Sequence, residues 1–314
     1  MSFGIGWKHM KICKNKAWVY LIWMVSCCIH AEVPKVSPHF VPATSAEAHW
    51  VFSGVVEGEG GEQYGYFFQM GRKKNTFHSR AALFDIQTKA VLIQDDSEAE
   101  IANPSTYLWH VGNAFLRFNP ITDSWFFGFK QANKAGFNFK VDMQKTFEAL
   151  PEPQNLRSGI SVFVSQTNSL NGHIHSSDGQ KEHFVTAGQA WFRQTSVTTP
   201  QANTHAVKGV LCRFDDGSGF YSVNLPEEDA LRGAITGRFD AKGLAEPMSQ
   251  FIHVEVRTDG KWGVHVPSPE QTVLVTAFMQ QDAVIAGIAE VGEQAGFCFL
   301  SEDTLGHQDE STTV

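Results

Sequence analysis

The sequence predicts an all-β protein made of two antiparallel β-barrels in tandem. Alternating apolar and polar runs recur at short intervals from Trp50 onward, and turn residues such as Gly, Asn and Asp separate them. Helical periodicity is hard to find in the same region. Many short strands joined by regular turns are typical of β-sandwiches and closed barrels, and the chain length favours two of them.

Residues 1–31 have the pattern of a signal peptide. Lysines between residues 11 and 16 precede an apolar run over residues 17–29, and Ala31 offers a small residue for cleavage. The apolar run is too short to span a bilayer comfortably. We expect export to the periplasm or secretion after cleavage; an uncleaved membrane anchor and lipidation of Cys27 are the alternatives.

The charge of the chain excludes some partners. The 314 residues carry a net charge of −8, and residues 1–31 hold four lysines and no acid. The remaining chain therefore has 21 basic and 33 acidic residues, a net charge of −12. Because phosphates would be repelled, we expect no nucleic acid partner, and membrane contact only through the N-terminal segment.

The first barrel is expected over residues 46–197. It opens with "WVFSGVV", "EGEGGEQ" and "YGYFFQMG", two alternating runs around a glycine-rich turn, which predict a hairpin. A phosphate-binding loop is excluded, since no helix follows these glycines. The polar link "TTPQANTHA" marks the end of this half.

The second barrel is expected over residues 204–301. Its alternating runs are divided by "FDDGSG" and "TDGK", both hairpin signals. Asp215 and Asp216 could pair as an acid and a base, but their turn-forming neighbours favour a solvated turn. Residues 302–314 form a polar tail that we expect to be disordered.

The cysteines permit one disulfide in the exported part. Three of the five lie in the first 31 residues, which leaves Cys212 and Cys298. In an oxidising compartment these two form either one disulfide or two separate buried thiols.

One histidine-rich segment resembles a metal site. "GHIHSSDGQKEH" contains His173, His175 and His183, and a hairpin could bring the third beside the first two, as zinc ligands require. An exposed polar hairpin explains the same residues without a metal. We therefore expect neither a metal nor another cofactor.

Aromatic residues crowd the first half. They either fill the barrel or line a ligand cavity inside it. The residues expected to contact a ligand are Tyr66, Trp109, Trp125, Trp191 and Arg193.

The order of several segments resembles the hydroxyneurosporene synthase and AttH-like family over residues 46–300. The segments that carry it are "WVFSGVVEGEGGEQYGYFFQMGR", "SRAALFDIQTKAVL", "YLWHVGNAFLRF", "NSLNGHI" and "GQAWFRQTSV". The resemblance implies two lipocalin-like barrels in tandem, and the family includes carotenoid hydratases. Many relatives carry an acid two residues after the tryptophan that matches Trp191, whereas this chain has Arg193. A guanidinium stays charged and only donates hydrogen bonds, so it cannot protonate a double bond.

Strand alternation places Trp191 and Arg193 on one face, opposite Ala190 and Phe192. If that face is the barrel interior, Arg193 forms either a structural ion pair with an acid or a contact with an anionic ligand group. If it is the outer face, Trp191 and Arg193 face solvent or the second barrel.

Three functional hypotheses follow. The first is an exported lipocalin-like protein, not an enzyme, that binds a hydrophobic or amphipathic lipid or isoprenoid. The second is a hydratase- or cyclase-like enzyme acting on such a molecule, with Asp85 in "AALFDI" as its acid. The third is a structural, partner-binding envelope protein with two filled barrels.

Overall fold

The computed structural model describes residue 45 and residues 47–104, 107–131, 135–143, 153–157, 159–167, 169–175, 182–188, 190–199, 205–225, 233–241, 245–248, 251–281 and 283–305. These residues form antiparallel strands, and none of them forms a helix long and apolar enough to cross a membrane. The predicted signal peptide and residues 306–314 of the predicted tail lie outside the described residues.

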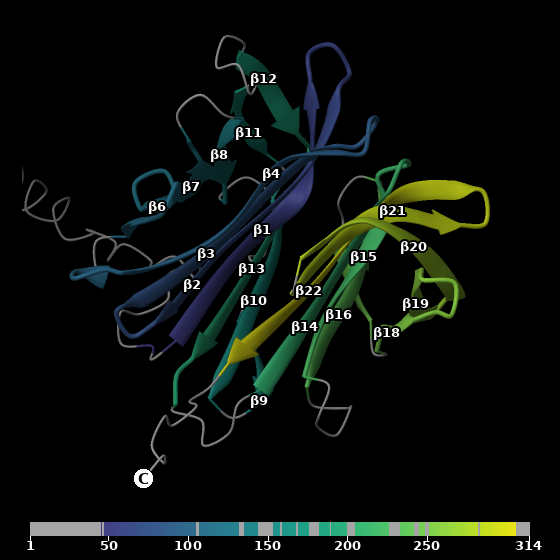
Figure 1. Cartoon of the computed structure of the whole chain (residues 1–314). Coiled ribbons are helices and arrows are strands. Elements are labelled where there is room, and N and C mark those ends of the chain that lie inside the picture. The colour runs from purple at the N-terminus through teal and green to yellow at the C-terminus, as the bar shows by residue number, and fades with distance from the viewer. Residues whose placement is uncertain are drawn as a thin grey trace, which may run out of the picture. The chain divides into compact units, whose positions relative to one another are not determined.

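The first sheet has 13 strands (Figure 1). They are β1 (Glu47–Gly58), β2 (Gln63–Lys73), β3 (Thr76–Asp85), β4 (Ala90–Glu100), β5 (Leu108–Val111), β6 (Ala114–Asn119), β7 (Ser124–Phe129), β8 (Gly136–Asp142), β9 (Gln154–Arg157), β10 (Ile160–Thr167), β11 (Leu170–His175), β12 (Glu182–Ala187) and β13 (Ala190–Val197). The main path runs β4-β3-β2-β1-β12-β11-β8-β7-β6-β5, and β5 returns beside β3 and β4. The sheet is therefore a nearly closed barrel.

Strand β1 changes neighbours along one of its edges. Residues 47–53 pair with β13, whereas Glu57 and Gly58 pair with β12. No described residue pairs with residues 54–56 on this edge, although β2 pairs with β1 along the other edge. The barrel wall is thus interrupted beside Gly54.

The second sheet has nine strands. They are β14 (His205–Phe214), β15 (Gly219–Asn224), β16 (Ala234–Phe239), β17 (Ala245–Met248), β18 (His253–Val256), β19 (Trp262–Pro267), β20 (Glu270–Gln281), β21 (Val284–Val291) and β22 (Gln294–Leu305). Their order is β17-β16-β15-β14-β22-β21-β20-β19-β18, and the two end strands do not pair, so this sheet is a half-barrel (Figure 1).

The predicted all-β class with two antiparallel barrels is confirmed. The hairpin expected around "EGEGGEQ" joins β1 to β2, and "TDGK" turns between β18 and β19 with Gly260 at a positive φ of 77°.

The last strand of the second barrel ends later than expected. β22 runs four residues past residue 301, where the sequence placed the end of this barrel, and Asp303 and Leu305 are buried. The low hydrophobicity of "SEDTL" concealed this strand end, because Ser301 and Asp303 face the first sheet and their polar side chains bond to Arg193 there.

Aromatic rings fill the interior of the first barrel. Phe52 stacks on Phe127 with centroids 4.3 Å apart, and Trp50 meets Trp109 at 4.7 Å. These four side chains are almost completely buried. Tilted and edge contacts between such rings add to the hydrophobic stabilisation of the core.

The outer faces of the two sheets form a second apolar layer. Residues that alternate with the barrel interior, such as Val51, Phe67 and Phe84 of the first sheet, cluster with Phe297 and Phe299 of β22. Phe84 and Phe297 stack with centroids 5.3 Å apart. The strands at this contact are therefore apolar on both faces, which explains their nearly continuous hydrophobic runs.

Cys212 and Cys298 form a disulfide inside the half-barrel. They are directly paired residues of β14 and β22, and both are fully buried. This is the first of the two alternatives that the sequence left open. The bond links residues 86 positions apart, so it restricts the unfolded chain strongly.

We expect a C212A/C298A variant to lose about 2–4 kcal/mol of unfolding free energy, because its unfolded state regains the entropy of an open 86-residue loop. Urea denaturation measures this loss. Dithiothreitol should lower the stability of the native protein and leave the variant unchanged; equal curves for the native protein with and without reductant would contradict the bond.

Candidate functional site

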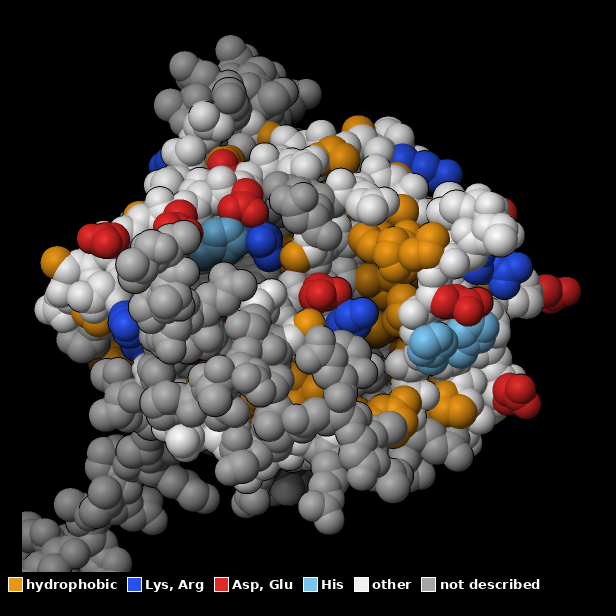
Figure 2. Space-filling view, turned by 60° about the horizontal axis from the view of Figure 1, so that its bottom comes forward, with side chains coloured by type: hydrophobic (Ala, Val, Ile, Leu, Met, Phe, Trp, Pro, Cys, Tyr) orange, Lys and Arg blue, Asp and Glu red, His pale blue; other side chains and the backbone are white. Residues whose placement is uncertain are grey.

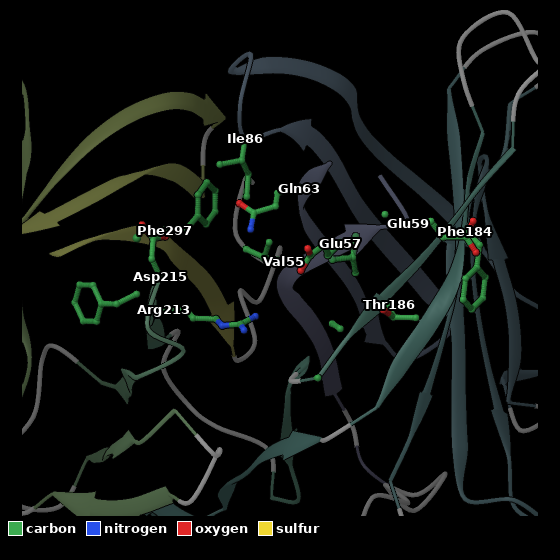
Figure 3. A pocket seen from close by; sticks show the side chains of 16 residues that line it. Val55, Glu57, Glu59, Gln63, Ile86, Phe184, Thr186, Arg213, Asp215 and Phe297 are labelled. Atoms are coloured by element: carbon green, nitrogen blue, oxygen red, sulfur yellow. The ribbon is translucent and has the colours of Figure 1, made fainter. Parts of the chain in front are cut away.

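A pocket of about 330 Å³ lies where the β1–β2 hairpin meets the β14–β15 turn and the start of β22 (Figure 3). Val55, Ile86, Phe184 and Phe297 supply apolar walls. Phe184 is 42% exposed, which is unusual for a phenylalanine on a strand. The volume falls at the lower end of the range for small-molecule sites.

The interruption in the barrel wall creates this pocket. Its lining includes residues 55–58 of β1 and residues 186–188 at the end of β12. These two segments diverge because β12 leaves β1 beyond Glu57, while β13 joins β1 only at Ser53. The pocket therefore lies outside the barrel, over the unpaired edge of β1.

Arg213 is the cation of the pocket. It is only partly exposed, and no described carboxylate lies within 4.0 Å of its guanidinium. Burial lowers the pKa of Arg213 below its usual value, while Tyr66, Glu57 and Asp215 act to raise it. Arginine nevertheless stays protonated in proteins.

Acidic side chains stand around this arginine. Glu57, Glu59 and Asp215 also line the pocket, and all three are exposed. In Figure 3 Arg213 and Glu57 extend into the same space from opposite sides. Their charged groups are more than 4.0 Å apart and form no direct ion pair, so the pocket presents both a hydrogen-bond donor and an acceptor to a ligand.

Tyr66, Trp109 and Trp125 lie inside the first barrel, where the sequence placed them as ligand contacts. Trp109 donates its indole N–H to the carbonyl of Pro104 at 2.9 Å. The Tyr66 hydroxyl and the Trp125 indole nitrogen have no hydrogen-bond partner within the described part of the chain. Burial raises the pKa of Tyr66, and Arg213 opposes this shift.

Trp191 and Arg193 lie on the outer face of β13, against the second sheet. The Trp191 ring packs on Tyr221 and Phe239, with centroids 4.5 and 5.2 Å away. Ala190 and Phe192 point into the first barrel, as alternation predicts. The sequence alone could not tell which face of β13 was the interior.

Arg193 forms a buried ion pair with Asp303 of β22. Its Nη2 donates to Asp303 Oδ2, its Nη1 donates to Ser301 Oγ at 3.4 Å, and Gln69 Nε2 donates to Asp303 Oδ1 at 2.6 Å. Arg193 and Asp303 are only 8% and 3% exposed. Gly209 of β14 leaves space for the guanidinium, since a Cβ there would collide with Arg193 Nη1.

Asp85 caps the turn that follows β3. Its Oδ1 accepts hydrogen bonds from the backbone N–H groups of Gln87 and Thr88, both at 2.9 Å. The structure therefore places this carboxylate in an Asx-type turn. Its neighbour Ile86, and not Asp85, lines the pocket.

The three histidines do not share one face. His173 and His175 lie beside Glu182, with His173 Nδ1 3.2 Å from Glu182 Oε1. His183 pairs with Ile174 and therefore points to the opposite face of the hairpin. In the described ranges no three His, Cys, Asp or Glu residues are arranged to hold a metal ion.

Asp216 belongs to the turn between β14 and β15. It accepts hydrogen bonds from the backbone N–H and the hydroxyl of Ser218, as expected for a turn residue.

Arg213, Glu57 and Asp303 are not among the site residues that the sequence predicted. Strand alternation could have indicated Arg213. It shares a face of β14 with Leu211, opposite Cys212, so it is a charged residue that continues an apolar face. The position of Glu57 beside Arg213 could not be found, because the two belong to different sheets 156 positions apart in sequence.

Comparison with solved structures identifies the fold. The chain superposes on AttH as assigned in Nitrosomonas europaea with a TM-score of 0.58 and 13% identity, over 82% of this chain and 92% of the other. Kievitone hydratase from Nectria haematococca gives 0.57 and 10%, over 88% and 95%. CghA with Sch210972 gives 0.50 and 10%, over 88% and 94%. At these identities the likeness establishes a shared AttH-like, lipocalin-type fold.

No family model matches the sequence. No curated protein matches it either.

We expect Asp303→Leu to lower the unfolding free energy by about 3–5 kcal/mol, because it leaves the Arg193 charge buried without a partner. The double variant R193M/D303L should recover most of the loss, since it removes both charges. Chemical denaturation of the wild type, the two single variants and the double variant forms the cycle. Additive losses would show that the two side chains are not coupled.

Proposed function

We propose that this protein is exported and binds a hydrophobic or amphipathic small molecule, of the lipid or isoprenoid class, in the pocket beside Arg213. The observation that carries the proposal is a pocket of about 330 Å³ in which apolar side chains stand beside a partly buried guanidinium and several exposed carboxylates. Apolar surface in a concave site can hold the hydrophobic part of a small molecule, and the polar groups can fix its orientation.

The pocket suits a ligand better than the barrel interior does. Rings occupy the interior of the first barrel, and the Trp109 and Trp125 side chains are packed among them. A ligand there would have to displace side chains from a dense core. The pocket, in contrast, offers space and exposed apolar surface from Phe184.

An enzyme is the second candidate. It is favoured by the fold shared with kievitone hydratase and by the Glu57 carboxylate, which extends into the pocket opposite Arg213 (Figure 3). Glu57 suits the role of acid or base better than Asp85, whose Oδ1 already accepts two backbone hydrogen bonds. Conversion of a bound isoprenoid that stops in a Glu57→Gln variant would favour this candidate.

Two features support export. The first is the lysine-rich and apolar N-terminal pattern, and the second is the Cys212–Cys298 disulfide, which needs an oxidising compartment to form and persist. On the described part of the face drawn in Figure 2, acidic and basic side chains are interspersed, and the largest group of hydrophobic side chains lies right of the centre. This distribution fits the proposed small-molecule role better than binding to a polyanion.

We expect Thr186→Trp to weaken binding of the fluorescent hydrocarbon 1,6-diphenylhexatriene at least tenfold. Thr186 is exposed and lines the pocket, so a large ring there occupies the ligand's space without disturbing a core. Val256→Trp, at an exposed position that is not part of the pocket lining, is the matched control. Fluorescence titration measures both, and equal affinities for the two variants would place the ligand elsewhere.

A further inference from the structure

One end of the second sheet is an open strand edge. β18 pairs with β19 along one edge, and no described residue pairs with its other edge (Figure 1). An unpaired edge presents a row of N–H and C=O groups to which another strand can bind. The strand at the opposite end of the sheet, β17, carries Pro247, which has no N–H to donate. β18 contains no proline, so its edge can accept a further strand.

The backbone of β18 directs alternate residues toward the free edge. Arg257, which follows the strand, donates its N–H to the carbonyl of Lys261 at 2.8 Å, across the hairpin toward β19. Backbone groups in an antiparallel ladder alternate between the two edges of a strand. The N–H and C=O groups of Glu255 therefore also face β19, and those of Val254 and Val256 face outward. A strand added at this edge would form its hydrogen bonds with these two valines.

The two faces of β18 differ in their chemistry. His253 and Glu255 point to one face, and both are exposed. His265 lies directly opposite His253 on β19, and its Nε2 is 3.0 Å from Glu255 Oε1. On the other face Val254 packs on the core of the half-barrel, whereas Val256 is 63% exposed. The free edge therefore carries one polar and one apolar row of side chains.

A second copy of the chain matches both rows. We propose that β18 pairs with β18 of a second copy, antiparallel and about a two-fold axis at Val254. This register places His253 opposite Glu255 of the second copy, and symmetry repeats the pair on the other side of the axis. On the apolar face Val254 meets its own copy, and Val256 lies opposite Ile252. Each side chain of the edge thus meets a partner of suitable chemistry.

Neighbouring registers fit less well. An axis at Glu255 would place the two Glu255 carboxylates against each other, and an axis at His253 would do the same with the two imidazoles. Like charges directly opposite each other are destabilising. An axis at Val256 would need the residues after Arg257 to continue the strand, but these form the turn with Gly260 at a positive φ. Val254 is therefore the axis that the side chains favour.

The first test measures self-association. A pairing of this size is small, so a weak dimer is expected, and sedimentation velocity over a range of protein concentrations should show a monomer–dimer equilibrium. Val256→Pro should weaken the dimer roughly tenfold, because it removes an outward N–H group and leaves the ladder to β19 intact. Val256→Thr keeps this N–H and is the matched control, expected within about threefold of wild type. A protein that stays monomeric at all concentrations, or equal affinities of the two folded variants, would overturn the proposal.

Charge reversal tests the pairing of His253 with Glu255. Glu255→Lys should weaken the dimer roughly tenfold, because it replaces the acceptor opposite His253 by a cation. The double variant H253E/E255K should recover wild-type affinity within about threefold, since the same register again joins a carboxylate to a cation. Glu246→Lys, at an exposed glutamate of β17, is the control for the change in net charge and should have no effect. A double variant as weak as Glu255→Lys would contradict the pairing.

Cysteine cross-linking tests the position of the axis. The two residues at the axis have Cα atoms about 5.5 Å apart, within the range of a disulfide, so Val254→Cys should give a covalent dimer on mild oxidation. The two copies of residue 256 lie roughly 14 Å apart in this register, so Val256→Cys should not. Faster cross-linking of Val256→Cys than of Val254→Cys would show that the strands meet elsewhere. Circular dichroism verifies that each variant is folded.

Discussion

Burial of two faces on the same strands is the constraint on which this molecule depends. β1, β2, β13, β14 and β22 direct one set of side chains into a barrel and the alternate set toward the other sheet. Without the other sheet, rings of the outer faces such as Phe67, Phe84 and Phe299 would be exposed to water. Each sheet therefore needs the other to cover its apolar outer face.

The ion pair between Arg193 and Asp303 gives this contact its register. Apolar surfaces can slide past one another at little energetic cost, whereas a buried guanidinium must meet its carboxylate. Gln69 binds the second oxygen of Asp303, and Gly209 leaves the space that Arg193 occupies. Side chains and backbone of β2, β13, β14 and β22 thus favour one relative position of the two sheets.

The pocket is a consequence of the same arrangement. Along β22 the interface side chains run from Leu305 through Asp303, Phe299 and Phe297 to the pocket at Gly296. At that end β12 and β13 have separated beside β1, and the described residues leave a pocket of about 330 Å³. A filled barrel and an open pocket are therefore compatible in one chain, because the pocket lies beside residues of both sheets and not inside a barrel.

The sequence by itself determined the all-β class, the two halves, the main turns and the alternation of β13, because strand period and turn chemistry are local properties. It also singled out Tyr66, Trp109 and Trp125 as aromatic residues of the first barrel that contact a ligand, and the structure places these three in the packed interior. Only the tertiary structure decided which face of β13 was the outer one, and that Arg193 meets Asp303 instead of a ligand-facing space. It alone brought Arg213, Glu57 and Asp215 into the lining of one pocket, and it separated His183 from His173 and His175. The physical reason is that these contacts join strands distant in sequence, whose relative position is set by packing of both sheet faces and leaves no pattern within any single segment.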